Sequence, residues 1–312
     1  MNWGMVNRIL VFLAMAIALY LLAIGGMAHV SLQGKPLIFR TGDYYNWPGG
    51  DSWQRFHEFD PRERQDAMII GSSHAYRGYD PAVFAERGHR VFNLGSSAQT
   101  PLNTYQLIKH YLDSTNCPLL IYDVYVGTFQ NSGLESTADL TQNQPSDGAA
   151  LGMAWALRDL RGLNMMALRM FTARNTPYYT SEHYQGLGFC LMTDSLKSAA
   201  GPPPLKQKGL LERQQQFFEA CLHLCRERGI PLVVSSHYAR RDRRGDVHGA
   251  LAHYMDSVLA GTGIPYLDYT NAPDIEDQNW FADHGHLNGT GARIFTGQLM
   301  DSLEAMGYLR KP

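Results

Sequence analysis

The first thirty residues contain the longest apolar stretch of the chain. From Ile9 to Ala28 there is no Lys, Arg, Asp or Glu, and Tyr20 is the only polar side chain. Twenty helical residues rise about 30 Å, which is the thickness of the hydrocarbon core of a bilayer. The pattern therefore predicts a membrane-spanning helix over residues 9–30, preceded by a cytoplasmic tail of residues 1–8.

Positive charges flank this apolar segment almost evenly. Arg8 precedes it, and Lys35 and Arg40 follow it, so charge alone does not set its orientation. A short tail ahead of a first apolar segment is typical of a signal anchor. The alternative is a cleaved signal peptide, since Gly26 and Ala28 are small, but the apolar region is longer than the usual span of about 7–15 residues. In either case we expect the remainder of the chain to be exported.

Five short apolar runs alternate with helical patterns after a connecting segment at residues 31–65. The runs cover residues 67–70, 90–94, 118–126, 231–235 and 264–268. Short buried-type strands that alternate with helices are typical of a parallel sheet in an α/β sandwich. We therefore expect one α/β domain over residues 66–312, built on a five-stranded parallel sheet.

Helical segments are predicted between these runs, at residues 105–112, 210–228 and 290–303. The second carries Cys221 and Cys225 on its apolar stripe and ends at Gly229, a normal stop signal. A metal site formed by the two cysteines with His223 is one interpretation. Core packing is favoured, because His223 falls elsewhere on the helical wheel.

A long insertion at residues 128–208 separates the third and fourth predicted strands. It holds a polar stretch, a Met-rich helical segment at residues 152–172 and an aromatic loop. Insertions of this length usually cap the active edge of a sheet or contact a partner, so we interpret it as a lid. Its methionines offer an adaptable docking surface, although ordinary packing is favoured. They are Met153, Met165, Met166 and Met170.

Composition narrows the class of protein. The chain has 312 residues, of which 45% are hydrophobic and 18% charged, as in a globular protein. The net charge is −2 and there is no long basic run, so we do not expect nucleic-acid binding. Four cysteines show neither paired zinc spacing nor the density of a disulfide scaffold. No phosphate loop or dinucleotide fingerprint is present, and no cofactor is expected.

The loop after the first predicted strand, with the sequence GSSHAYRG, offers a nucleophile. In a parallel sheet, the loops at the carboxyl ends of the strands form the binding crevice. Ser73 lies two residues after Gly71, whose missing side chain lets the backbone turn sharply. We predict that the Ser73 Oγ is presented to a base. The alternative is a Ser/Gly turn that caps the next helix.

The expected base lies near the C-terminus, in the sequence DHGH. Asp283 and His286 are three residues apart in a turn, so the carboxylate can accept the Nδ1–H and hold Nε2 toward Ser73. The alternatives are an Asx turn at a helix start and a metal site of Asp283, His284 and His286. The metal site is disfavoured, because no other ligand cluster accompanies it. We therefore predict a Ser-His-Asp triad and no metal.

An oxyanion requires hydrogen-bond donors, and the loop after the second strand supplies candidates. Gly95 follows this strand and can bring its backbone N–H close to a reacting carbonyl. Asn93, or the backbone N–H of Ser73, is the candidate for a second donor.

Together these blocks resemble the SGNH, or GDSL-like, hydrolase superfamily over about residues 67–303. Residues 71–73 match its first block, Gly95 its second, and Asp283 with His286 its last. The resemblance implies a flavodoxin-like α/β/α sandwich in which Ser73 is the nucleophile and Gly95 an oxyanion donor. The third block is missing, because the third strand reads YDVYVGTF and offers no counterpart to the usual asparagine.

A narrower resemblance comes from GSSHAYRGYDP and FNLGSSAQTP behind one N-terminal anchor. This combination is similar to exported SGNH proteins of the DltD and alginate-acetylation type. Those families handle acyl groups on envelope polymers, often beside a membrane-bound O-acyltransferase. The resemblance implies a single-pass membrane protein whose extracytoplasmic domain, periplasmic or at the cell surface, acts as an esterase or O-acyltransferase on an envelope polysaccharide or another acylated polymer.

Three further side chains are candidates for contact with the substrate. His74 and Arg77 flank the predicted nucleophile, and His237 follows the fourth strand. Solvent-facing turn positions are the alternative interpretation. A basic run beyond His237 offers contacts to an anionic polymer or lipid headgroups, with a solvated loop as the default. It contains Arg240, Arg241, Arg243 and Arg244.

A non-catalytic role is the main alternative to an enzyme. A protein of this kind would use the cleft to bind a glycan or would dock an acyltransferase. The missing third-block asparagine and the aromatic approach segment favour this interpretation. The aromatic residues are Tyr44, Tyr45, Trp47 and Trp53.

Overall fold

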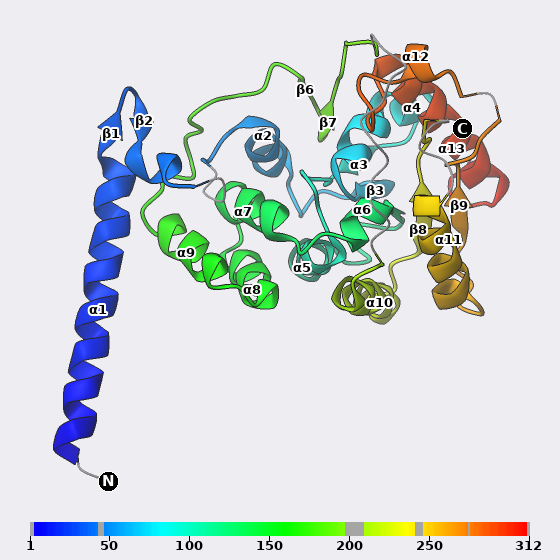
Figure 1. The fold of residues 1–312 in the computed structure, drawn as a ribbon. Helices are drawn as coiled ribbons and strands as arrows, with labels where there is room; N and C mark the ends of the chain where they lie inside the picture. The colour runs from blue at the N-terminus through cyan, green and yellow to red at the C-terminus, as the bar shows by residue number, and fades with distance from the viewer. Residues whose placement is uncertain (1–2, 43–46, 197–208, 241–245, 274, 311–312) are drawn as a thin grey trace.

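A five-stranded parallel sheet lies at the centre of the domain. The computed structural model describes residues 3–42, 47–196, 209–240, 246–273 and 275–310. The strands are β3 (Ala67–Ile70), β4 (Val91–Asn93), β5 (Leu120–Asp123), β8 (Leu232–Ser236) and β9 (Tyr266–Asp268). Their order in the sheet is β4-β3-β5-β8-β9, and all neighbours are parallel (Figure 1). This is the 2-1-3-4-5 order of flavodoxin-like sheets, and the predicted fold class is confirmed.

Helices cover both faces of the sheet. Because side chains alternate along a strand, Met68 and Ile70 of β3 enter one core and Ala67 and Ile69 the other. The first core is covered by α5 (Pro101–Tyr111), α10 (Glu212–Glu227) and α11 (Asp246–Leu259). The second is covered by α3 (Ser73–Gly78), α4 (Pro81–Glu86) and α13 (Gly289–Ala305). Burial on both faces explains why the strands are continuous apolar runs rather than alternating ones.

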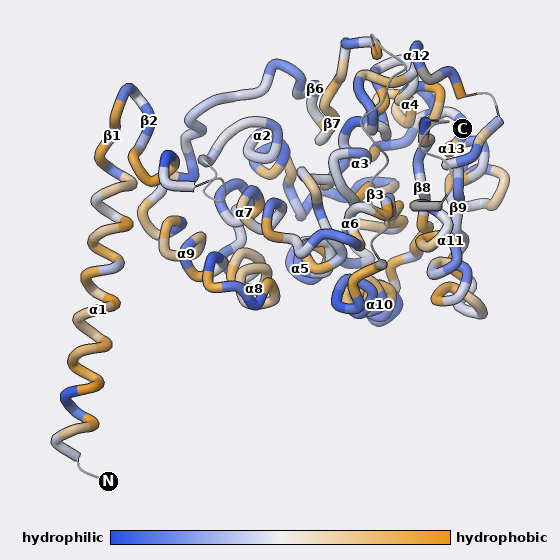
Figure 2. Tube along the Cα trace, viewed as in Figure 1, coloured by the Kyte–Doolittle hydropathy of each residue, from blue (hydrophilic) through white to orange (hydrophobic). Residues whose placement is uncertain are grey.

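The N-terminal helix projects from the domain. Helix α1 (Trp3–His29) is the one helix of the described residues that is long and apolar enough to cross a membrane. Most of its length stands clear of the other elements and carries apolar side chains (Figures 1 and 2). The chain then passes through β1 (Ser31–Leu32), β2 (Lys35–Pro36), the 3-10 helix η1 (Leu37–Arg40) and α2 (Gly50–Glu58).

The insertion between β5 and β8 contains more regular structure than its sequence predicts. Its elements are α6 (Val126–Phe129), α7 (Leu134–Asn143), α8 (Asp147–Leu157), α9 (Leu160–Arg169), β6 (Tyr184–Gly186) and β7 (Phe189–Cys190). Helices α7, α8 and α9 pack on one another and extend the helical layer from α5 toward α1 (Figure 1).

The predicted Met-rich helix is two helices. Arg158 takes the left-handed conformation with φ 52°, and the Asp159 side chain caps α9 by accepting from the backbone N–H of Arg161. Met153 is buried in the core that α5 covers, and Met165 in a small cluster with residues of α7 and α8, as the favoured interpretation predicts, whereas Met170 is exposed.

The β6–β7 hairpin lies against the end of β4. The backbone N–H of Asn93 donates to the Leu187 carbonyl at 2.9 Å. Gly188, with φ +82°, approaches so closely that a Cβ there would lie 1.8 Å from the Asn93 carbonyl oxygen. Only glycine fits this contact, which joins the insertion to the strand that precedes Gly95.

The replacement Gly188→Ala should therefore reduce the free energy of unfolding by about 1–3 kcal/mol, because the methyl group forces backbone movement at a left-handed position. Denaturant unfolding measures the change. Gly297→Ala is the matched control: it lies in α13 with open space around it, so it should be neutral or stabilising by about 0.5–1 kcal/mol. Equal stability of the two variants would contradict the close packing of the hairpin.

Candidate active site

Ser73 is the first residue of α3, which follows the inner strand β3 after a two-residue turn. The turn between them is tight: Gly71 has φ +156°, and a Cβ there would lie 2.8 Å from the Cβ of Asp123. The Ser72 side chain caps the helix by accepting from the backbone N–H of His74. The cap thus belongs to Ser72, and the Ser73 hydroxyl is left for other partners.

The structure brings Ser73 and His286 together. The Ser73 Oγ lies 2.8 Å from the His286 Nε2. On the other side of the ring, the His286 Nδ1 lies 2.8 Å from Asp283 Oδ2 and 3.0 Å from Oδ1. The serine hydroxyl, the imidazole and the carboxylate therefore form a continuous hydrogen-bonded chain, the arrangement in which an imidazole can remove a hydroxyl proton.

The Asp283 carboxylate is held in its ionised form. Its Oδ1 accepts the backbone N–H groups of Gly285 and His286, each at 2.8 Å. Partial burial raises the pKa of this carboxyl, but the hydrogen bonds from His286 and Gly285 outweigh burial and hold the pKa well below its usual range. A permanent anion beside Nδ1 keeps the Nδ1–H tautomer and leaves Nε2 as the acceptor.

The end of the insertion supports the loop that carries Asp283 and His286. Phe281 pairs with Leu287 across the loop, and the Ala282 N–H donates to the His286 carbonyl at 2.9 Å. At the end of the insertion, the Leu196 N–H donates to the Phe281 carbonyl at 3.0 Å. A second backbone hydrogen bond joins Gly289 to this end of the insertion. The geometry of the triad therefore depends on the insertion as well as on the sheet.

His74 lies at the centre of a stack of three imidazoles. Its ring is 4.8 Å from that of His286 and 4.3 Å from that of His237, centroid to centroid. The His74 side chain is buried, so the alternative of a solvent-facing turn position does not apply to it. Burial lowers the pKa of His74 well below its ordinary value, and the neighbouring His237 and His286 add to the effect. His74 is therefore a neutral spacer between two rings that each bond to a carboxylate.

A second His-Asp pair lies on the far side of His74. The His237 Nδ1 lies 2.8 Å from Asp123 Oδ1, which also accepts the Tyr79 hydroxyl at 2.7 Å. The other carboxylate oxygen, Oδ2, is buried and meets no hydrogen-bond partner within the described residues. Asp123 is absent from the site residues that the sequence predicts, although its position at the end of the third strand places it at the same sheet edge as Ser73.

The predicted oxyanion donors Asn93 and Gly95 are engaged elsewhere. The buried Asn93 amide donates to the Ala75 carbonyl at 2.8 Å, and its Oδ1 accepts the Gly95 N–H at 3.0 Å. Asn93 thus holds α3 against β4 instead of facing a ligand. Within the described chain, no acceptor contacts the backbone N–H of Ser73. This group, at the first turn of α3, is the open donor next to the nucleophile.

Two other predicted positions have different surroundings from those expected. Arg77 lies beside the Tyr76 ring, 5.3 Å from Cζ to centroid. Arg240 is not solvated: it is buried, and its Nη1 lies 2.6 Å from the His284 Nδ1. The interpretation of Arg240 as part of a solvated loop is wrong, because its side chain is buried and contacts His284. Arg241, Arg243, Arg244, Tyr44 and Tyr45 lie outside the described residues.

The residues considered as metal ligands do not converge. His284 turns to Arg240, and His223 lies 3.3 Å from the carboxylate of Glu227 on the exposed side of α10. Cys221 and Cys225 are buried as free thiols. Among the described residues, no three His, Cys, Asp or Glu side chains are grouped to hold a metal ion.

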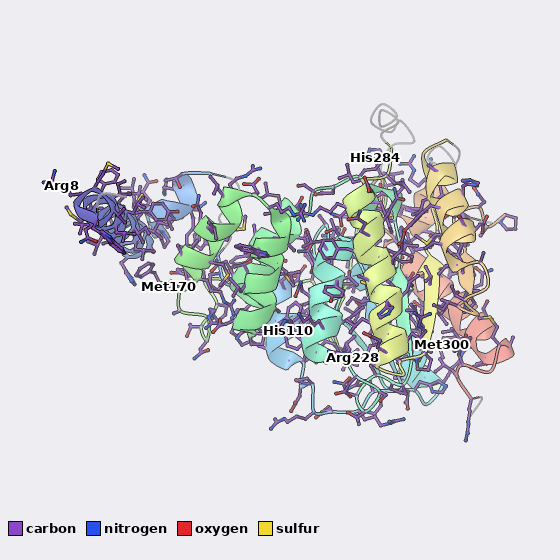
Figure 3. All side chains as sticks on the ribbon, turned by 90° about the horizontal axis from the view of Figure 1, so that it is seen from below. Arg8, His110, Met170, Arg228, His284 and Met300 are labelled. Carbon is purple, nitrogen blue, oxygen red and sulfur yellow. The ribbon has the colours of Figure 1, made fainter. Side chains whose placement is uncertain are left out.

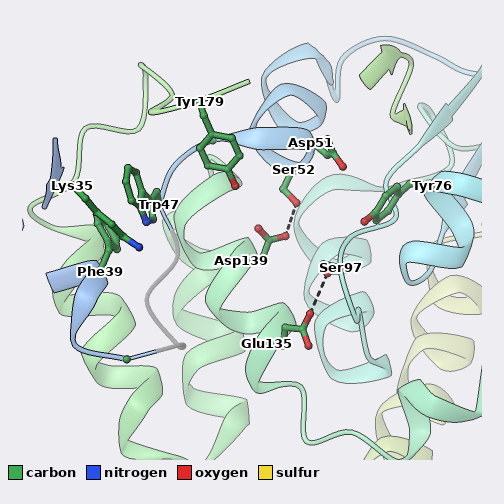
Figure 4. Close-up of a pocket in the computed structure, with 12 residues that line it drawn as sticks. Lys35, Phe39, Trp47, Asp51, Ser52, Tyr76, Ser97, Glu135, Asp139 and Tyr179 are labelled. Carbon is green, nitrogen blue, oxygen red and sulfur yellow. Dashed lines mark hydrogen bonds between the residues drawn. The ribbon is translucent and has the colours of Figure 1, made fainter. Parts of the chain in front are cut away.

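A cavity of about 480 Å³ opens next to α3 (Figure 4). Trp47 and Tyr179 supply aromatic walls, and Asp139 and Glu135 supply carboxylates. The cavity reaches the nucleophile helix through Tyr76, one turn after Ser73, so the two side chains share a face of α3. Of the predicted aromatic segment, Trp47 lines this cavity. Trp53 instead donates its ring N–H to the Arg174 carbonyl at 2.6 Å.

Two of the three comparisons with known proteins found no match. No protein-family model and no curated protein matches the chain. Among solved structures, a Parabacteroides merdae protein assigned as a GDSL-like lipase is similar over 79% of this chain and 98% of its own, with 11% identity and a TM-score of 0.26.

Protonation of His74 should be visible in the stability of the domain. A base whose pKa is lowered by folding binds its proton more weakly in the folded chain. Below its ordinary pKa of 6.5 the unfolded chain therefore takes up a proton that the folded chain does not, and the free energy of unfolding falls by at most about 1.4 kcal/mol per pH unit. Urea unfolding between about pH 7.5 and about pH 5 measures this slope.

The variant His74→Gln should flatten the slope, because glutamine does not titrate. His183→Gln is the matched control, since His183 is exposed, and it should keep the slope of the wild type. An unchanged slope in His74→Gln would show that burial does not hold His74 neutral.

Proposed function

We propose that this chain is a serine acyl-transfer enzyme, an esterase or O-acyltransferase, anchored to a membrane by α1 with its catalytic domain outside the cytoplasm. The observation that carries the proposal is the 2.8 Å contact between the Ser73 Oγ and the His286 Nε2, with Asp283 bonded to Nδ1. This is the geometry required to make a neutral serine hydroxyl nucleophilic.

The proposed reaction has two steps. His286 Nε2 takes the Ser73 proton as Oγ attacks the acyl carbonyl, and the resulting imidazolium is stabilised by Asp283. The tetrahedral oxyanion accepts the Ser73 backbone N–H, and its collapse expels the alcohol, which takes the proton from His286. The hydroxyl of an acceptor, or water, then gives its proton to His286 and attacks the ester carbonyl. Collapse of the second tetrahedral intermediate breaks the bond to the Ser73 Oγ, which takes that proton back from His286.

The acceptor that we propose is a polyhydroxylated polymer such as an envelope polysaccharide. The cavity beside α3 supports this, because sugar rings pack their C–H faces on aromatic side chains and donate hydroxyls to carboxylates. Tyr179 and Trp47 offer such faces, and Glu135 and Asp139 offer acceptors. The resemblance to DltD-type and alginate-acetylation-type proteins adds a membrane-bound O-acyltransferase as the proposed partner that supplies the acyl group.

A non-catalytic glycan-binding accessory is the second candidate. The engagement of the Asn93 and Gly95 donors favours it, because an oxyanion would have fewer donors than the superfamily pattern implies. A chemical probe of the serine separates the two candidates.

A fluorophosphonate probe should label the wild-type protein, and Ser73→Ala should abolish the labelling. The same variant should lose several powers of ten in kcat on an activated short-chain ester, because no other group takes the role of nucleophile. Ser257→Ala is the control, since Ser257 is exposed on α11 and should be labelled like the wild type. Folded wild-type protein that takes up no probe would exclude the enzyme and favour the accessory.

The cavity can be tested through the acceptor. Tyr179→Ala should reduce kcat/KM for transfer to a polysaccharide about 2- to 12-fold, the equivalent of an aromatic contact of about 0.5–1.5 kcal/mol. Hydrolysis of a short activated ester should remain unchanged, and Tyr179→Phe should restore transfer because it keeps the ring. Equal losses of transfer and hydrolysis in Tyr179→Ala would contradict a role in binding the acceptor.

A further inference from the structure

The outer end of α1 is packed against the domain. The Tyr20 hydroxyl donates to Asn164 Oδ1 of α9. One and a half turns later, Gly25 faces the Phe171 ring, where a Cβ would lie only 3.1 Å from the ring. Ile24 shares a buried cluster with Leu168 of α9. From Tyr20 onward, α1 and α9 therefore lie side by side.

This contact limits the length of α1 that is surrounded by lipid alone. The residues from Ile9 to Tyr20 rise about 18 Å, which is less than the hydrocarbon thickness of about 30 Å. The full apolar run from Ile9 to Ala28 does match that thickness. A bilayer that covers the whole run must also reach the part of the domain that lies beside Tyr20 and Gly25, namely α9.

At that depth, α8 and α9 carry large apolar side chains that are exposed. Leu160 is 78% exposed, Trp155 76% and Met170 71%, although each is a large apolar side chain. Leu151 and Leu163 are also exposed on the same two helices. We call these five residues the α8–α9 apolar face. Helices α8 and α9 include orange segments in Figure 2, and Met170 lies on the α1 side of the domain in the view from below (Figure 3). Soluble surfaces rarely gather so many large apolar groups.

We propose that the α8–α9 apolar face is immersed in the outer leaflet of the membrane, so that the domain sits partly in the bilayer beside its own anchor. The inference rests on the proposed membrane anchoring by α1. Helices that lie in the interface bury their apolar side about 5–10 Å into the boundary between headgroups and acyl chains. The rise of the stretch from Ile9 to Tyr20 is roughly 12 Å shorter than the hydrocarbon core, and the depth of an interfacial helix is comparable to this difference. This difference in length favours lipid over a protein partner as the group that covers the α8–α9 apolar face.

A fluorescent depth probe on the full-length chain tests the proposal. All four native cysteines are buried, and burial raises the pKa of the Cys190 and Cys225 thiols to about 12, so an introduced surface cysteine can be labelled selectively. The dye NBD is attached to Leu160→Cys, Leu13→Cys or Met306→Cys. The proteins are placed in nanodiscs of phosphatidylethanolamine and phosphatidylglycerol, with or without brominated acyl chains, which quench the dye on contact.

Leu13 lies in the exposed part of α1, and Met306, 41% exposed at the end of α13, is the matched apolar control far from α1. The proposal expects loss of fluorescence at Leu160→Cys and Leu13→Cys, and none at Met306→Cys. Quenching at Leu13→Cys without quenching at Leu160→Cys would overturn it, leave the anchor intact and point to a protein occupant of this face. Absence of quenching at Leu13→Cys would overturn the anchor and the inference together. The fluorophosphonate result on Ser73 is independent of all three outcomes.

Discussion

The hydrogen bond between Ser73 and His286 joins two segments that lie 213 residues apart. It forms because β3 delivers Ser73 to the carboxyl edge of the sheet, and a short bridged loop ahead of α13 brings His286 to the same edge. Each partner is constrained separately: the Ser72 cap and Asn93 hold α3, while two backbone N–H groups and the imidazole hold Asp283. Proton transfer to the imidazole requires contact of this kind, so the proposed chemistry depends on both supports.

The buried His74 ring lies between this triad and a second carboxylate–imidazole pair. Asp123 and His237 repeat the carboxylate-imidazole contact on the opposite face of the His74 ring. The His74 ring between the two pairs is disfavoured as a cation, because burial lowers its pKa and the neighbouring His237 and His286 add to the effect. The stack thus combines close packing of three rings with a central imidazole that stays neutral.

The insertion links the site to the proposed membrane anchor. Its helices contact α1, its hairpin lies on β4, and its last segment hydrogen-bonds the loop that carries His286. The cavity next to α3 lies along the same path, because Lys35, Phe39 and Trp47 of the segment after α1 line it together with Tyr76. An acceptor bound there would lie between the end of α1 and the proposed nucleophile.

The local sequence pattern was sufficient to predict the sheet and the long apolar helix, and to select Ser73, Asp283 and His286 as candidates. Strand burial, helix length and turn chemistry are properties of short segments, so they can be recognised in the sequence. Pattern failed where long-range contacts decide the surroundings of a side chain. It assigned the Asn93 amide to an oxyanion, although that amide donates to the Ala75 carbonyl, and it left Arg240 in solvent, although this side chain is buried and contacts His284. It also omitted Asp123, whose partners Tyr79 and His237 lie 44 and 114 residues away. Spacing along the chain holds no information about such contacts. Only the packed structure determines which donor meets which acceptor, and which groups water no longer reaches.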